Sequence, residues 1–365
     1  MRIKGKHFRS IWREGDCIKI IDQRYLPYEL KIVELSSLEE FFYAIKEMQV
    51  RGAPLIGVTA AYGIAKSIYE DPGDENLLKA CKILEKTRPT AINLFWAINI
   101  LKKELLNINI DDRRNKAMGL ADSIANDDIS KNEMIGINGA EILKELARNQ
   151  NKSIINVLTH CNAGWLATVD KGTALSPIFK ARDEGLNIHV WVDETRPRNQ
   201  GSLTAWELEN EEIEHTVVVD NAGGHLMQTG LIDIVIVGSD RTSLNGDVCN
   251  KIGTYLKALS AKDNDIPFYA ALPISTIDHK IEDGLEIPIE NRSNLEVKNI
   301  RGLDLNQNIV EISLYPNENT RILNPAFDVT PARLVTKIIT DKGVCLPEKK
   351  EISKLLNNGE KIELE

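Results

Sequence analysis

Five short, mostly apolar runs that are rich in β-branched residues limit the fold of this chain more than any other feature. They lie in its second half, and segments with helical or glycine-containing sequence separate them; they cover residues 154–159, 188–192, 216–219, 232–237 and 268–272. Continuous rather than alternating hydrophobicity is typical of strands covered on both faces, as in a parallel sheet between two layers of helices. We therefore predict a doubly wound α/β domain for this half of the chain.

The first half of the chain has a different pattern. Short strands and turns are expected up to about residue 45, with β-rich segments at residues 18–21 and 28–35. Because proline fits the first turn of a helix, Pro54 predicts a helix towards Ser67, and Pro89 predicts another towards Leu105. Two further helices are expected at residues 111–128 and 132–148, and a charged terminal helix at residues 348–365.

These patterns predict an α/β protein with two domains. Residues 1–130 are expected to form a smaller, mainly helical N-terminal domain with short strands, and residues 131–365 the parallel-sheet domain.

Three polar segments follow predicted strands, at residues 160–164, 193–201 and 238–241. Ligands bind beyond the carboxyl ends of the strands in an open parallel sheet, so we expect these segments to form one site. Cys161 and Asp240 are its candidate functional groups. Each has a structural alternative, because a lone cysteine is commonly a small buried apolar residue and an aspartate commonly caps a helix.

A second set of residues is suited to bind an anion. Arg51-Gly52-Ala53 precedes Pro54, where free backbone N–H groups and the positive end of a helix would attract a phosphate. Arg88 has the same position before the next predicted helix, and Asn250-Lys251 is expected early in a further helix. Alternatively, Gly52 forms only a turn and Arg51 is a surface charge. The segment 328–331, Asp-Val-Thr-Pro, is interpreted as a capped helix start with a structural role.

Composition argues against several classes of function. The formal net charge of −9 argues against a protein that binds nucleic acid through its overall charge. A few local groups must therefore hold any anionic ligand. We find no apolar stretch of about eighteen residues that would span a membrane, and no signal-peptide core at the start. The five cysteines and six histidines lack the spacing of disulfide frameworks and metal sites. We expect a cytoplasmic protein without a metal or a dinucleotide cofactor.

Several segments, taken in order, resemble the methylthioribose-1-phosphate isomerase family. Among them are Thr159-His160-Cys161-Asn162-Ala163-Gly164 and Gly238-Ser239-Asp240-Arg241; the others cover residues 51–58, 88–94, 193–197, 245–254 and 324–331. The resemblance extends over nearly the whole chain. It implies a Rossmann-like second domain, a homodimer, no cofactor, and an aldose–ketose isomerase of methionine salvage that converts S-methyl-5-thioribose 1-phosphate to S-methyl-5-thioribulose 1-phosphate.

The resemblance also implies roles for individual residues. The family's catalytic pair falls on Cys161 and Asp240. Its substrate- and phosphate-binding residues fall on Arg51, Gly52, Ala53, Arg88, Gln200, Asn250 and Lys251.

The chain departs from the family pattern near the expected site. Ser239 replaces an alanine and Trp165 a small residue, and there are changes at Asp170-Lys171 and Ser176-Pro177. A 5-deoxyribose 1-phosphate, or a broader range of 5-substituted sugars, is therefore also a candidate substrate. The wider superfamily offers two other functions, a ribose-1,5-bisphosphate isomerase and a non-catalytic regulatory subunit of the initiation factor 2B type. The presence of both Cys161 and Asp240 favours an enzyme.

Overall fold

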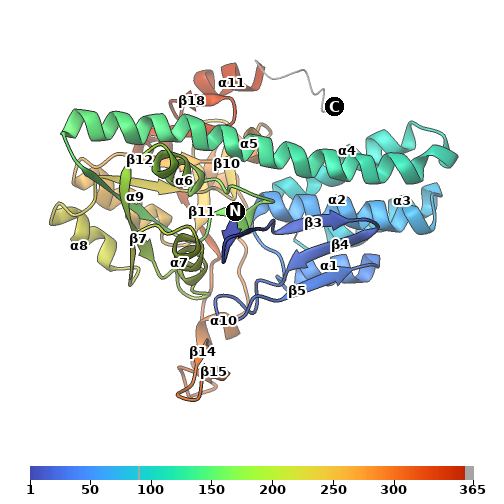
Figure 1. Cartoon of the computed structure of the whole chain (residues 1–365), viewed down its shortest axis with the longest axis horizontal. Coiled ribbons are helices and arrows are strands. Elements are labelled where there is room, and N and C mark those ends of the chain that lie inside the picture. Colours follow the sequence, from blue (N-terminus) through green and yellow to red (C-terminus); the bar gives the residue numbers. More distant parts are fainter. Residues whose placement is uncertain (89–90, 358–365) are drawn as a thin grey trace.

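The computed structural model describes residues 1–88 and 91–357, and its largest sheet has seven strands (Figure 1). The strand order is β18-β17-β12-β9-β6-β7-β8, and all neighbours are parallel except β17 and β18. The strands are β6 (Ile154–Thr159), β7 (Asn187–Asp193), β8 (His215–Val218), β9 (Ile234–Val237), β12 (Phe268–Ala271), β17 (Lys337–Thr340) and β18 (Gly343–Cys345). The five apolar runs of the sequence correspond to β6, β7, β8, β9 and β12, so the predicted parallel sheet is confirmed.

Alternate side chains of the central strands enter two different cores. Val157 and Ile234 pack on one side of the sheet, whereas Leu158 and Val235 pack on the other. The first core is completed by α5 (Arg113–Gln150), α6 (Ser176–Asp183) and α7 (Gly201–Asn210), and the second by α8 (Ala222–Gln228), α9 (Thr254–Asp263) and α11 (Lys349–Asn357). Because successive strand residues face opposite sides, helices cover both faces of the sheet, as in a Rossmann-like fold.

The N-terminal part is mainly helical with short antiparallel strands, as predicted. Its strands are β1 (Arg2–Ile3), β2 (Lys6–His7), β3 (Ile11–Glu14), β4 (Cys17–Ile21) and β5 (Ile32–Leu35), and its helices are α1 (Leu38–Lys46), α2 (Ala53–Glu70), α3 (Asp74–Glu85) and α4 (Ile92–Leu106). Helix α1 was not expected, although the capping box of Ser37 and Glu40 is a sequence signal for its start. Pro89 lies outside the described residues, as do residues 358–365 of the expected terminal helix.

One long helix replaces the two helices that were expected between residues 111 and 148. Helix α5 runs for 38 residues without a break. Two of its glycines serve close packing, because a Cβ atom at Gly136 would lie 2.4 Å from Ser176 Oγ and one at Gly139 would lie 2.4 Å from Pro177 Cγ. Ala125 of α5 belongs to the N-terminal core and Ile135 to a core of the parallel sheet. We propose that the two parts of the chain divide between these residues, near residue 130.

A four-stranded sheet corrects two of the sequence predictions. It has the order β13-β10-β11-β16, formed by β10 (Arg241–Ser243), β11 (Val248–Lys251), β13 (Ile277–Asp278) and β16 (Phe327–Thr330). Asn250 and Lys251 therefore lie in a strand and not in a helix, because β11 pairs with β16. Asp328, expected to cap its own segment, lies in β16 and accepts the N–H groups of Gly253 and Tyr255 at 2.7 and 3.1 Å. It thus caps α9, a helix remote in sequence.

A hairpin of β14 (Asn299–Leu303) and β15 (Ile309–Ser313), preceded by α10 (Leu295–Lys298), extends away from the rest of the molecule (Figure 1). The Tyr28 hydroxyl donates to the carbonyl of Arg301 at 3.3 Å and so connects the hairpin to the N-terminal part. None of the helices in the described ranges is long and apolar enough to cross a membrane.

The packing of α5 can be tested with two alanine substitutions on the same helix. Gly139→Ala places a methyl group against Pro177, so we expect the free energy of unfolding to fall by about 1–3 kcal/mol. Gly119 is exposed and has no atom within 4 Å of an added Cβ, so Gly119→Ala should raise it by about 0.5–1 kcal/mol. Urea denaturation measures both, and equal effects would contradict this account of the glycines.

Candidate active site

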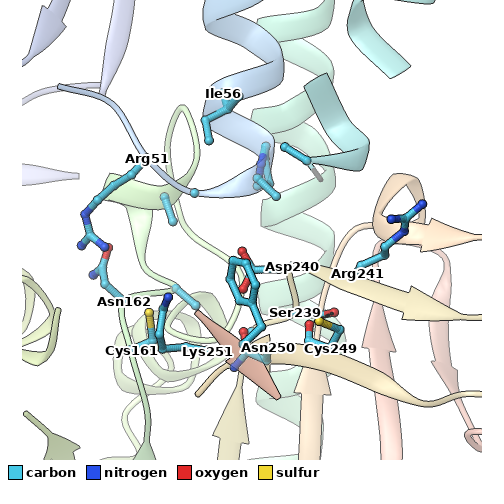
Figure 2. Close-up of a pocket in the computed structure, with 18 of the residues that line it drawn as sticks. Arg51, Ile56, Cys161, Asn162, Ser239, Asp240, Arg241, Cys249, Asn250 and Lys251 are labelled. Carbon is cyan, nitrogen blue, oxygen red and sulfur yellow. Dashed lines mark hydrogen bonds between the residues drawn. The ribbon is translucent and has the colours of Figure 1, made fainter. Parts of the chain in front are cut away.

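The order of the strands in the large sheet reverses at β6. The chain first adds β7 and β8 on one side of β6, and then adds β9 and β12 on the other side. Neighbouring loops diverge at such a point and leave a crevice at the carboxyl ends of the strands. Cys161 follows β6 and Asp240 follows β9, so both lie at this crevice and face one pocket (Figure 2).

This pocket brings together all nine site residues that were predicted from the sequence. They come from the start of α2, the segment before α4, the ends of β6 and β9, the start of α7, and β11: Arg51, Gly52, Ala53, Arg88, Cys161, Gln200, Asp240, Asn250 and Lys251. Of the departures from the family pattern, Ser239 lines the pocket. Trp165 is fully buried in a separate apolar cluster, and Asp170 forms a 2.7 Å bond with the His7 ring.

Cys161 is held by its backbone on both sides. Its N–H donates to the Thr195 hydroxyl, and its carbonyl accepts from the Thr204 hydroxyl, each at 2.8 Å. Its φ of 69° lies in the left-handed region, where residues other than glycine are uncommon and strained. Burial raises the pKa of the Cys161 thiol, while the nearby cations of Lys251 and Arg51 act in the opposite direction.

Asp240 lies among charged groups of the pocket. Burial raises the pKa of its carboxyl group above the ordinary value. The positive charges of Lys251, Arg292 and Arg88 all act to lower this pKa. Desolvation outweighs these cations, and a raised pKa is what a proton donor at neutral pH needs.

The start of α2 has the features of an anion site. Gly52 has φ 96°, and a Cβ atom there would lie 2.4 Å from the carbonyl oxygen of Ala167, so glycine is required. No side chain of the described residues caps this helix end. Arg51 beside it is half-buried, and burial lowers its pKa to about 10. Its Nη2 atom is buried and makes no hydrogen bond to any described residue. Free N–H groups and a buried guanidinium nitrogen without a partner favour a bound anion.

Lys251 supplies a cation from the opposite wall. Its Nζ donates to the Ala326 carbonyl at 2.9 Å and lies 4.5 Å from the centre of the Phe327 ring. Burial lowers the pKa of Lys251 to about 8, with the Arg292 charge acting in the same direction. Asn250 donates to the Thr254 hydroxyl at 3.0 Å, and Gln200 has a buried Oε1 without a partner in the described part of the chain.

Three pocket residues were not singled out from the sequence. Arg198 lies in a predicted polar segment and pairs with Glu296 at 2.8 Å. Arg292 and Phe327 also line the pocket. Arg292 lies in the irregular chain between η4 (Gly284–Glu286) and α10, where no motif or periodicity distinguishes one arginine from another.

The buried Glu207 of α7 fixes the loop that follows Cys161. Its carboxylate accepts from the Asn162 side chain at 2.8 Å, from the N–H of Trp165 at 2.9 Å and from the N–H of Leu166 at 3.2 Å. Burial raises the pKa of Glu207 to about 7, against the effect of these donors. Three hydrogen bonds to one side chain keep this wall of the pocket in place.

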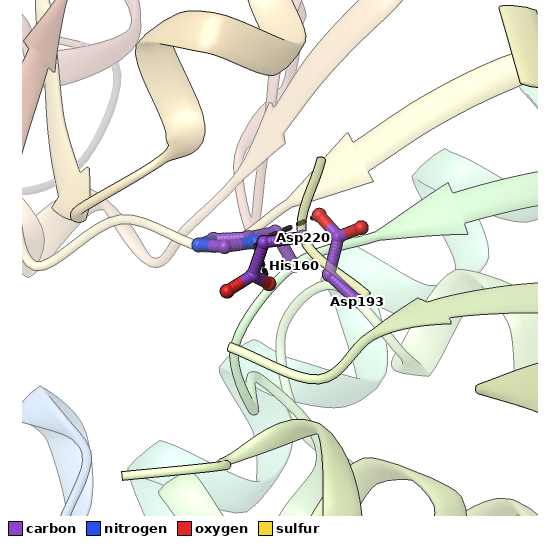
Figure 3. Close-up of side chains that lie close together, drawn as sticks. All are labelled: His160, Asp193 and Asp220. Carbon is purple, nitrogen blue, oxygen red and sulfur yellow. Dashed lines mark hydrogen bonds and ion pairs between the residues drawn. The ribbon is translucent and has the colours of Figure 1, made fainter. Parts of the chain in front are cut away.

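Behind Cys161, the side chains of His160, Asp193 and Asp220 come close enough to suggest a metal site (Figure 3). Their partners argue for an ion network instead. Lys257 Nζ lies 3.1 Å from Asp193 Oδ2, so an ammonium group already neutralises that carboxylate. Asp220 accepts the backbone N–H groups of Thr195 and Arg196, each at 2.8 Å. Thr195, which holds the N–H of Cys161, also donates its hydroxyl to the Asp193 carbonyl at 3.0 Å and links this network to the pocket.

Comparisons with other proteins agree with this geometry. Residues 49–347 match the Initiation factor 2 subunit family. The chain is 53% identical over 356 residues to a protein named methylthioribose-1-phosphate isomerase from Escherichia coli O45:K1 (strain S88 / ExPEC), covering 97% of this chain and 96% of that one.

Two solved structures are similar at almost the same level. One is 5-methylthioribose 1-phosphate isomerase from Pyrococcus horikoshii OT3, with a TM-score of 0.83, 39% identity and 97% of each chain covered. The other is subunit delta of the translation initiation factor eIF-2B from A. fulgidus, with a TM-score of 0.80, 38% identity, and 96% of this chain and 100% of that one covered.

Both nitrogens of the His160 ring lie close to an oxygen: Nδ1 is 2.8 Å from the Asp193 carboxylate, and Nε2 is 2.8 Å from the Ile252 carbonyl. The residue before Cys161 is therefore held from two sides.

Proposed function

Because this chain belongs to the Initiation factor 2 subunit family and, within it, to the methylthioribose-1-phosphate isomerases, we propose that it is a sugar-1-phosphate aldose–ketose isomerase. Its reaction would convert S-methyl-5-thioribose 1-phosphate to S-methyl-5-thioribulose 1-phosphate, a step of methionine salvage. The observation that carries the proposal is that Cys161 and Asp240 face the same cation-lined pocket. Such a pocket suits a substrate that keeps its phosphate while its carbon skeleton reacts.

In this proposal the phosphate is held at the start of α2. Arg51, Arg88 and Lys251 supply positive charge, and the backbone N–H groups of Gly52 and Ala53, which line the same pocket, would donate to phosphate oxygens. Gln200 and Asn250 contribute polar contacts to the sugar phosphate. The phosphate would remain bound from aldose to ketose, which keeps C1 and C2 at a fixed place relative to the reacting groups.

Asp240 is proposed as the proton donor for ring opening. The sugar is an aldose locked as its 1-phosphate, so the bond between C1 and the ring oxygen must break before isomerisation. A protonated Asp240 would give its proton to that oxygen as the bond breaks, and burial raises the pKa of its carboxyl group in support of this role. The ring oxygen keeps the proton as a hydroxyl of the open chain.

Cys161 is proposed to act on C1 and C2 once the ring is open. In one route it mediates proton transfer from C2 to C1; in the other it stabilises the transition state of a hydride shift between these carbons. In both routes the electrons of the C2–H bond end at C1, and the C2 hydroxyl loses its proton to Asp240, which restores the acid. The proton-transfer route needs the Cys161 thiolate: burial opposes its formation by raising the pKa of the thiol, and the cations of Lys251 and Arg51 favour it.

Three finer points extend the proposal. We propose 5-deoxyribose 1-phosphate as a further substrate, because one apolar group at C5 discriminates by only about 1–3 kcal/mol. The chain acts as a homodimer, by analogy with the family, which light scattering can measure. It works in the cytoplasm, in keeping with five cysteines that are all free thiols.

A direct assay tests this function. Purified protein is given S-methyl-5-thioribose 1-phosphate, 5-deoxyribose 1-phosphate or ribose 1,5-bisphosphate, and ³¹P NMR follows the ketose product with and without EDTA. Conversion of one or both 5-modified sugars in both tubes supports the proposal; preference for the bisphosphate makes the chain a ribose-1,5-bisphosphate isomerase. Binding without conversion would favour a regulatory subunit, the alternative suggested by the similarity to subunit delta.

Substitution of the two proposed catalytic groups gives a sharper prediction. Cys161→Ser and Asp240→Asn should each lower kcat by about 10²–10⁴-fold, the range for loss of a positioned acid or base. Cys17→Ser changes a half-buried thiol that does not line the pocket, so it is the matched control. Circular dichroism checks that all three variants are folded, and normal turnover by either pocket variant would contradict the assignment.

The proposed phosphate site predicts a pH dependence. Lys251 has a pKa of about 8, so it is charged below this pH and loses its proton as the pH rises through it. The KM for the sugar phosphate should therefore increase above pH 8. Lys251→Met should have a raised KM at neutral pH, and its KM should not increase further above pH 8. Steady-state kinetics between about pH 6.5 and 9.5, a range that extends to both sides of this pKa, measure both effects.

A further inference from the structure

Glu290 lies between two buried arginine side chains and forms no hydrogen bond with either of them. Its Oε2 lies 3.5 Å from Arg88 Nη2 and 3.4 Å from Arg292 Nε. Both separations exceed the usual range for N–H···O hydrogen bonds of about 2.7–3.2 Å. Glu290 Oε2, Arg88 Nε and Arg292 Nε are all buried without a hydrogen-bond partner in the described ranges. These three atoms are thus held by charge alone, and their own hydrogen-bonding capacity is unused.

The positive charge of Arg292 acts on three other cations of the pocket. Its side chain is 8% exposed, and its charge acts on Arg51, Arg88 and Lys251, lowering the pKa of each. Its guanidinium also lies 5.7 Å from the centre of the Phe327 ring, which Lys251 contacts as well. Four buried cations close together repel one another, and a single carboxylate compensates for only part of this charge.

From this arrangement we propose that Arg292 is a ligand of the substrate's phosphate. In the free protein the Glu290 carboxylate, which lies beside the pocket and not in its lining, pairs with Arg88 and Arg292 in place of that phosphate. The identity of the ligand as a sugar phosphate rests on the proposed function. When the dianion enters, Glu290 turns away, and the unused N–H groups of Arg88 and Arg292 bind phosphate oxygens. Arginine suits this exchange, because its planar N–H groups match both carboxylate and phosphate.

Glu290 is built so that its side chain can leave while its backbone stays. Its carbonyl accepts the N–H of Ala326 at 2.9 Å, and the N–H of Arg292 donates to the Asn324 carbonyl at 2.9 Å. These two bonds anchor the segment next to β16. The Glu290 side chain is 29% exposed, far more than either arginine, so rotation brings its charge to solvent without loss of a hydrogen bond to Oε2.

Binding of inorganic phosphate, followed by calorimetry, tests this proposal without turnover. Glu290→Gln removes the competing charge, so we expect phosphate to bind about fivefold more tightly. Arg292→Met removes a charge-assisted ligand but keeps a long apolar side chain against Phe327, and we expect binding to weaken about 10–100-fold. Arg292→Lys should lie between Arg292→Met and the unchanged protein, because it keeps the charge but loses the planar geometry.

Melting temperatures provide a second, independent readout. Without ligand, Glu290→Gln should melt at a lower temperature, because the arginines lose their counter-charge. Saturating phosphate should then raise its melting temperature by more than it raises that of the unchanged protein. Glu286→Gln and Arg321→Met are the matched controls, since both side chains are exposed and outside the pocket, and neither should change phosphate affinity.

The outcomes separate this proposal from the proposed function. Weaker phosphate binding by Glu290→Gln would mean that Glu290 supports the site or contacts the ligand, and unchanged binding by Arg292→Met would remove Arg292 from it; either result overturns the proposal even if the unchanged protein isomerises its sugar. Conversely, if no sugar is isomerised but the two variants shift phosphate affinity in the expected directions, the exchange stands and the enzyme assignment fails.

Discussion

The reversal of strand order at β6 is the constraint on which the rest of the molecule depends. Because β6 pairs with β7 on one side and β9 on the other, the loops after β6 and β9 separate at one edge of the sheet. Cys161 and Asp240 are each the second or third residue beyond those strands, so the sheet alone brings together groups that are 79 positions apart (240 − 161). The remaining walls of the pocket, from α2, α7 and β11, fit around this pair.

The second determinant of the site is how it balances buried charge. Cations outnumber carboxylates around the pocket, and burial lowers the pKa of Arg51, Arg88 and Lys251 while it raises that of Asp240. An empty pocket of this kind is electrostatically unfavourable, and an incoming dianion relieves the repulsion. The network of His160, Asp193 and Lys257 lies just behind the pocket. Cys161 is therefore placed between a network whose members pair with one another and a group of cations that requires a bound anion.

The sequence predicted those parts of the fold that depend on neighbouring residues. Strands β6, β9 and β12 are largely buried on both faces, so the sequence of each is mostly apolar. Gly52 beside Arg51 is a local signal for a helix start suited to an anion. It did not predict features that arise from distant pairing. Lys251 lies in a strand because it pairs with Phe327 of β16, far away in the sequence. Arg292 is held beside the pocket by a hydrogen bond from its N–H to the Asn324 carbonyl. Neither feature leaves a local pattern.

Helix α5 determines how rigidly the two parts of the molecule are joined. Its 38 residues correspond to a rod about 57 Å long, and its two halves are embedded in different cores. The N-terminal part carries Arg51 and Arg88, whereas the other part carries Cys161, Asp240 and Lys251, so the pocket spans both. A rod shared by two cores resists bending between them. The two walls of the pocket are therefore kept at a set separation by the backbone hydrogen bonds of one helix, and fine adjustment is left to side chains.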